Sequence, residues 1–155
     1  MNKNMFDYDN YFLNIGISVL SRKINSYLGS NYPTDDHREL LKYLFETFYE
    51  FRIKTIVYRA IKNKIIPKNL RNKFVSGCST KEDVINFIKK RYDKGYNYIV
   101  VSKEPIEAFD LYSFIEFINN KYGDGSINNF YQDEKEVFFK FKKGNDWFEM
   151  IDISK

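Results

Sequence analysis

The chain has 155 residues and is most simply one domain (residues 1–155), because a chain of this length buries roughly 68–70% of the surface that its unfolded form exposes. Its formal net charge is +4 and aromatic residues make up 19%, so we expect a ring-rich core. The single cysteine, Cys78, excludes an intramolecular disulfide framework and a thiolate zinc cluster, and favours a reducing, cytoplasmic location. The apolar run 11–20 is too short to span a bilayer, so we expect no membrane partner.

The N-terminal region has helical periodicity. Apolar residues recur at spacings of three and four from Phe12 to Leu28, behind Asp7 or Asp9 as caps, and Gly29 is placed to end this helix. A second helix is predicted to begin at Thr34, whose side chain can cap it.

The second predicted helix carries a stripe that begins apolar at Leu41 and turns basic at Arg52 and Arg59. A short third helix is predicted over 68–75, after Pro67. The segment 79–82 has the form of a capping box and predicts a fourth helix that ends at Gly95. A helix-turn-helix interpretation of these last two helices is disfavoured, because the recognition helix would open with two acidic residues.

The spacing of apolar residues changes after Gly95 and is no longer helical. The β-branched run 96–102 predicts an interior strand, and Pro105 predicts the start of a fifth helix that ends at Gly123. The remainder is typical of a meander, with strands expected at 126–131, 136–142 and 147–153. We therefore expect an α+β fold: a helical N-terminal half with four helices (about residues 1–95), followed by a β-α-β-β-β unit (about 96–155) with a small, mainly antiparallel sheet.

The most informative feature is a basic segment. Residues 51–81 contain nine Lys or Arg residues and no Asp or Glu. On a helical wheel Arg52, Arg59 and Lys62 fall within about 80° of one another, next to the apolar stripe. A concentrated cationic face supplies phosphate affinity that does not depend on base sequence.

The leading hypothesis is a small, non-enzymatic cytosolic protein that docks a basic helical face (residues 52–73) on nucleic acid or a nucleoprotein. The residues expected to form the contact are Arg52, Arg59, Lys62, Lys64, Lys68, Arg71 and Lys73. The structural alternative is that Arg52 and Arg59 pair with acids of the C-terminal third, and the candidates are Glu107, Glu116 and Glu149.

A second class of function is a protein–protein inhibitor or adaptor, for example a viral or mobile-element factor that blocks a host enzyme. Aromatic abundance and small size favour it, because Tyr, Trp, Phe and Arg are enriched at interface hot spots. Its acidic surface would mimic phosphates and would comprise Asp133, Glu134, Glu136 and Glu149. A homodimer through the aromatic-rich helix at 8–28 is a further possibility.

Hydrolase chemistry is the third class. Cys78 lies just before a predicted helix and would need the only histidine, His37, as its base. The carboxylates near 133–136, with Lys140, superficially suggest a metal-dependent nuclease, but an even spacing is typical of an exposed strand face. The segment 123–125 is too short to cradle a phosphate and is expected to be a turn. We therefore assign no catalytic residue, metal or cofactor.

Overall fold

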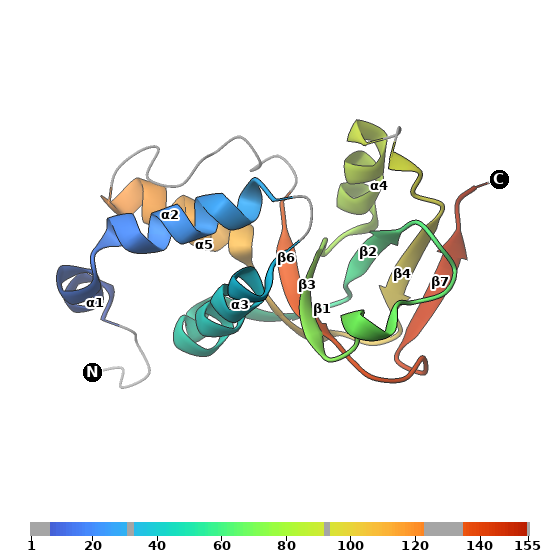
Figure 1. The fold of residues 1–155 in the computed structure, drawn as a ribbon, viewed down its shortest axis with the longest axis horizontal. Coiled ribbons are helices and arrows are strands. Elements are labelled where there is room, and N and C mark those ends of the chain that lie inside the picture. Colours follow the sequence, from blue (N-terminus) through green and yellow to red (C-terminus); the bar gives the residue numbers. More distant parts are fainter. Residues whose placement is uncertain (1–6, 31–32, 92–93, 123–134, 155) are drawn as a thin grey trace.

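The computed structural model describes residues 7–30, 33–91, 94–122 and 135–154, with residues 12–15 as backbone only. It contains helices and antiparallel strands, which confirms the α+β class (Figure 1). The described helices are α1 (Tyr8–Ile15), α2 (Ile17–Leu28), α3 (Asp35–Thr47), α4 (Lys81–Lys90) and α5 (Leu111–Tyr122). The described strands are β1 (Arg52–Thr55), β2 (Tyr58–Ile61), β3 (Lys73–Gly77), β4 (Tyr98–Ser102), β5 (Ile106–Phe109), β6 (Val137–Phe141) and β7 (Phe148–Asp152).

The strands form two sheets that pack against each other. The four-stranded sheet has the order β1-β5-β6-β3 and the three-stranded sheet has the order β2-β4-β7. They are linked where Tyr58 and Cys78 exchange two backbone hydrogen bonds, each 2.8 Å long. The pairs β1/β2, β4/β5 and β6/β7 each place one strand in each sheet, so the chain crosses between the sheets repeatedly.

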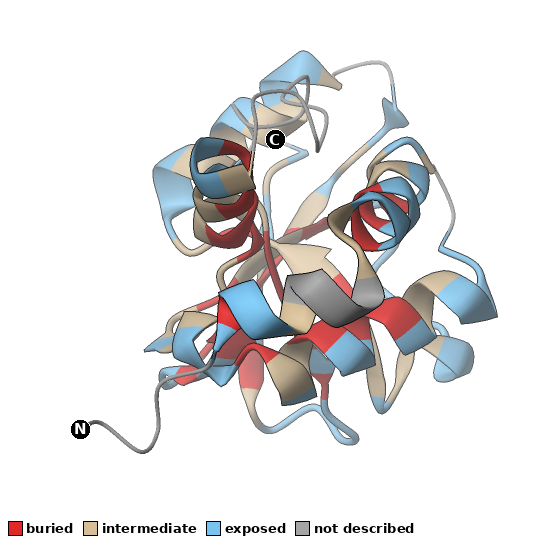
Figure 2. Cartoon of the chain, turned by 90° about the vertical axis from the view of Figure 1, so that its left-hand side faces the viewer, coloured by how far each residue is buried: buried red, intermediate tan, exposed pale blue. Residues whose placement is uncertain are grey.

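Three apolar clusters stabilise this arrangement. The first lies between α1, α2, α3 and α5 and the outer face of the four-stranded sheet, where Phe109 and Phe138 are fully buried. The second lies between the sheets and includes Val75, Val100 and Phe139. The third lies under α4, on the three-stranded sheet. Strand β6 is buried at each residue except Lys140, which is exposed. The helices of the left-hand layer in Figure 1 carry both buried and exposed segments (Figure 2).

The N-terminal helices follow local signals. Gly16 has a φ of 88°, which favours glycine, and it divides the single predicted helix into α1 and α2. Gly29 follows the last residue of α2, as predicted. The Thr34 cap is confirmed: its Oγ1 accepts the backbone N–H of His37, and the Thr34 N–H donates to Nδ1 of His37.

The predicted continuation of the second helix through Arg52 and Arg59, and the predicted third helix at 68–75, are wrong. Helix α3 ends at Thr47, and the residues expected to continue it form β1 and β2, so the basic helical face of residues 52–73 does not exist. The predicted third helix is a 3-10 turn at Lys68–Leu70 followed by β3. The physical reason is pairing with β5, β4 and β6, whose hydrogen bonds and apolar neighbours outweigh a local helical pattern.

The remaining predicted elements are largely confirmed. Helix α4 is present, but its cap lies one residue later than the predicted box at 79–82, because Oγ1 of Thr80 accepts the N–H of Asp83, and the helix ends at Lys90, before the predicted Gly95. Strands β4, β6 and β7 lie within their predicted ranges. The predicted fifth helix starts later, because 106–109 is β5 and Asp110 accepts the N–H of Ser113 at the start of α5. The predicted strand at 126–131 and the turn at 123–125 lie outside the described residues.

Candidate functional site

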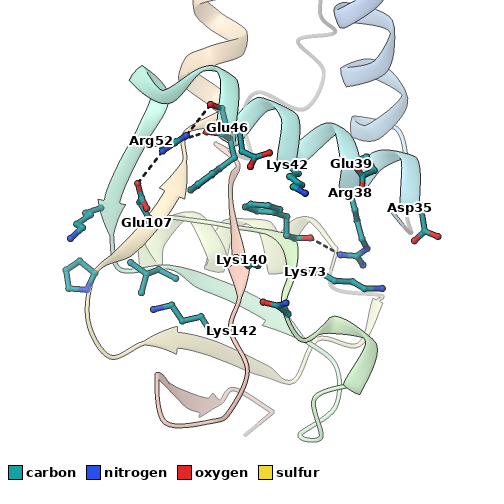
Figure 3. Close-up of a pocket in the computed structure, with 16 residues that line it drawn as sticks. Asp35, Arg38, Glu39, Lys42, Glu46, Arg52, Lys73, Glu107, Lys140 and Lys142 are labelled. Carbon is teal, nitrogen blue, oxygen red and sulfur yellow. Dashed lines mark hydrogen bonds and ion pairs between the residues drawn. The ribbon is translucent and has the colours of Figure 1, made fainter. Parts of the chain in front are cut away.

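A groove of about 1120 Å³ lies between α3 and the outer face of the four-stranded sheet. One side is formed by α3, and the floor is formed by β1, β3, β5 and β6 (Figure 3). The groove therefore brings together side chains that are as much as about 100 residues apart in the sequence, from Asp35 to Lys142.

Helix α3 has two different sides. Leu40, Leu41 and Leu44 are buried in the helical cluster. The groove is lined by residues at spacings of three and four, which place side chains on one helical stripe. This stripe comprises Asp35, Arg38, Glu39, Lys42, Phe45 and Glu46.

The floor is made by side chains of the strands, including the neighbours Lys73 and Phe74 at the start of β3. Lys54 of β1 lies opposite Glu107 of β5, and Lys140 of β6 lies opposite Phe74 of β3. Lys142 follows two residues beyond Lys140 and also lines the groove. The rings of Phe45 and Phe74 meet with centroids 5.1 Å apart, where α3 approaches the sheet.

The groove is strongly charged. Among the described residues, its lining includes seven cations and four carboxylates. Five of the cations are lysines, and they come from α3, β1, β3, β6 and the residue that follows β6: Lys42, Lys54, Lys73, Lys140 and Lys142. None of these five ammonium groups forms an ion pair or a side-chain hydrogen bond in the described structure. Figure 3 shows Lys73, Lys140 and Lys142 on the strand side, below Lys42 and Arg38 of α3.

Arg52 has structural partners instead. Its Nε donates to the carbonyl of Phe45 over 2.6 Å and Nη2 donates to the carbonyl of Glu46 over 3.3 Å, at the end of α3. The guanidinium lies 4.7 Å from the centroid of the Phe45 ring and 4.0 Å from a carboxylate oxygen of Glu107. The predicted pairing of Arg52 with Glu107 is therefore confirmed. Arg38 also has a backbone partner, because it donates to the carbonyl of Phe74.

Arg59 lies away from the groove, where it is largely enclosed. Its Nη1 donates to the carbonyl of Ser76 over 2.7 Å, and its Nε is buried without a hydrogen-bond partner. Burial lowers the pKa of Arg59, and nearby Tyr27 opposes this shift. None of the three acids predicted as partners forms an ion pair with Arg59 among the described residues.

The other predicted cations are distributed over different surroundings. Arg71 donates to the carbonyl of Gly144 and to Oδ1 of Asn145, which fastens the turn between β6 and β7. Lys62, Lys64 and Lys68 are exposed between β2 and β3 and do not line the groove. Of the predicted binding residues, Lys73 and Arg52 line the groove.

Sequence reasoning missed Lys42, Lys54, Lys140 and Lys142 as members of one surface. A signal for two of them was present. Every second residue from 138 to 142 is Phe138, Lys140 or Lys142, which indicates one strand face that changes from apolar to basic.

The predicted acidic surface is only partly described. Asp133 and Glu134 lie outside the described residues, and Glu149 is exposed on β7. Glu136 accepts a hydrogen bond from the hydroxyl of Tyr27. Burial, together with the nearby Glu136 carboxylate, raises the pKa of Tyr27 well above its ordinary value.

The residues considered for catalysis have structural partners. His37 contacts Thr34 and Ser26 at the start of α3. Cys78 is 4% exposed and packs in the third apolar cluster, under α4, whereas His37 lies at the start of α3. In the described ranges, no group of three or more His, Cys, Asp or Glu side chains is suited to hold a metal ion.

None of the described helices has the length and apolar character needed to cross a bilayer. In comparisons with known proteins, no family model, no curated protein and no solved structure matches this chain.

Proposed function

We propose that this protein is a non-enzymatic binding protein that holds a nucleic-acid chain in the groove between α3 and the four-stranded sheet. The observation that supports it is the convergence of five lysines without ion pairs, from α3, β1, β3, β6 and the residue that follows β6, on one concave surface of the described structure. Each ammonium group offers three hydrogen-bond donors to phosphate oxygens.

In the absence of a ligand, the five lysines of the groove raise the free energy of the folded protein, because their like charges repel one another. A polyanion relieves this repulsion and releases its own condensed counterions when the lysines replace them. Each phosphate that is neutralised contributes about 0.7 to 0.9 to the slope of log affinity against log salt concentration. Five contacts therefore give a slope of about −4.

The test is fluorescence anisotropy with labelled oligonucleotides of mixed sequence, titrated with protein between roughly 50 and 200 mM salt. We expect the triple variant with Lys73→Ala, Lys140→Ala and Lys142→Ala to bind at least about tenfold more weakly, with a slope that is smaller by about 2 to 3. The loss should be similar for all base sequences, because phosphate contacts carry no sequence information.

A control variant separates the groove from net charge. Lys81→Ala, Lys89→Ala and Lys103→Ala remove the same charge from exposed positions that do not line the groove. This variant should retain affinity within about threefold, since screening weakens distant charges. Equal losses in the two triple variants, or affinity that is insensitive to salt, would contradict the proposal.

The loop cations form a third comparison. Lys62, Lys64 and Lys68 were predicted from sequence to bind, and they are exposed outside the groove. If the variant with alanine at these three positions loses as much affinity as the groove variant, the binding surface extends along the loop. If only this variant loses affinity, the groove is not the site.

A further inference from the structure

The groove separates its charges by element. Of its four carboxylates, Glu107 is paired with Arg52. The other three, Asp35, Glu39 and Glu46, all belong to α3 and are exposed, with no ion pair in the described structure. The strands and the residue that follows β6 contribute Lys54, Lys73, Lys140 and Lys142 to the floor. The floor is therefore mainly cationic, whereas the helical wall adds carboxylates to its own Arg38 and Lys42 (Figure 3).

A single strand matches this two-sided arrangement better than a duplex does. A single strand carries phosphates along one edge and exposes the hydrogen-bonding edges of its bases along the other. A duplex carries phosphates on both outer edges, so that one row would face the carboxylates of α3 and be repelled. The half-buried rings of Phe45 and Phe74, between wall and floor, add apolar surface for a base.

The wall also discriminates among bases. An ionised carboxylate only accepts hydrogen bonds, so it needs a donor opposite it. Cytosine presents the N4 amino group and adenine presents the N6 amino group, whereas thymine presents the O4 oxygen at the equivalent position. A thymine carbonyl facing Glu39 or Glu46 would place two acceptors together.

We infer that the groove selects single-stranded nucleic acid and favours the bases whose amino group is N4 or N6, cytosine and adenine, over thymine or uracil, which carry the O4 oxygen there. This inference depends on the proposed function, because it assigns the phosphates to the floor lysines, which are four of the five lysines proposed to bind them. It adds that the carboxylates of α3 face the bases.

The experiment compares fluorescein-labelled dC12, dA12 and dT12 single strands, and the dA12·dT12 duplex, by anisotropy at one salt concentration. We expect dC12 and dA12 to bind about tenfold more tightly than dT12, the effect of one good base contact. The duplex should bind more weakly than dC12. Equal binding of dC12 and dT12 with an intact salt slope overturns this inference alone, whereas failure of every oligonucleotide to bind at low salt overturns the proposed function as well.

Neutral variants of the wall test the mechanism. Glu39→Gln with Glu46→Gln should raise affinity for all strands, because two negative charges leave the path of the phosphates. An amide both donates and accepts, so the preference for dC12 over dT12 should fall to about twofold or less. Glu82→Gln with Glu104→Gln changes the same charge at exposed positions outside the groove and should leave the preference at about tenfold. An unchanged preference in the Glu39 and Glu46 variant contradicts the assignment.

Discussion

Two halves of one sheet face have opposite characters. On the outer face of the four-stranded sheet, Phe109 of β5 and Phe138 of β6 are fully buried beneath the helices. Two residues away on the same strands, and on the same face, Glu107 and Lys140 are exposed in the groove. The strand backbone is continuous between the two halves, and the side chains change from rings to charged groups where the helical cover ends.

The difference shows how one sheet combines a packed core with an open, charged groove. In the covered half, the rings of Phe109 and Phe138 stack with centroids 4.8 Å apart, and Phe114 of α5 packs 5.5 Å from Phe109. In the open half, α3 approaches the sheet through Phe45 and leaves Lys54, Lys140 and Lys142 exposed. Because the covered half fixes the strands, it holds the lysines of the open half in position.

The largest expected effect tests this division directly. Phe138→Ala removes a fully buried ring and should lower the free energy of unfolding by about 3–5 kcal/mol. Lys140→Ala, two residues along the same face, should change it by less than about 0.5 kcal/mol. Urea unfolding followed by circular dichroism measures both. If Phe138→Ala does not fold, Phe138→Leu gives the same comparison with a smaller loss of stability. Equal losses at Phe138 and Lys140 would contradict the division into a covered and an open half.

A second variant tests the inner face of the four-stranded sheet, where the Tyr58–Cys78 bridge links it to the three-stranded sheet. A Cβ atom at Gly77 would lie 2.7 Å from the carbonyl oxygen of Tyr58 and 2.8 Å from Cε1 of Phe139. Since the Tyr58 oxygen belongs to the backbone bridge, Gly77→Ala should destabilise the fold by about 1–3 kcal/mol. Gly29→Ala is the control, because its Cβ would meet only ordinary contact at 3.5 Å, and no loss is expected. A thermally neutral Gly77→Ala would show that the sheets can separate locally.

The third prediction compares two cations on one strand. Arg52 binds the carbonyls of Phe45 and Glu46 and pairs with Glu107, so Arg52→Ala should cost about 1 kcal/mol, a value reduced for its partial exposure. Lys54→Ala should leave stability unchanged and weaken oligonucleotide binding severalfold. Thermal unfolding and anisotropy on the two variants separate the roles. The reverse pattern would mean that Arg52 contacts the ligand and Lys54 supports the fold.

The sequence predicted those elements that depend on neighbours along the chain. Thr34 and Thr80 cap helices through residues three positions away, and Gly29 follows the end of α2. The segment 52–61 could not be assigned in this way, because its partners lie about 40 to 57 residues further on, as in the pairing of Arg52 with Phe109. Its apolar positions fit a helical stripe and a pair of strands alike, so long-range pairing decided the outcome.

The same dependence on long-range pairing limited how much of the candidate site could be predicted. A cluster of charge along the sequence predicted one basic face, but strands separate neighbours that a helix would align. Lys54 and Lys73 reach the groove, whereas Arg59 and Arg71 bind backbone carbonyls elsewhere. Lys140 joins the groove only because β6 pairs with β3, a register that composition does not contain.

The smallest expected effect concerns the covered end of β6, where Tyr27 of α2 donates to Glu136. Burial and the Glu136 carboxylate raise the pKa of Tyr27 in the folded state, whereas an unfolded tyrosine ionises near pH 10. The contribution of Tyr27 to stability is therefore complete below pH 10 and falls as the pH rises above it, by about 1 kcal/mol at pH 11. Tyr27→Phe should be less stable than the native protein at pH 8, and the difference should shrink toward pH 11 in urea unfolding. A difference that stays constant would mean that the hydroxyl ionises equally in the folded and unfolded chains, and that this end of the sheet is open to water as the groove is.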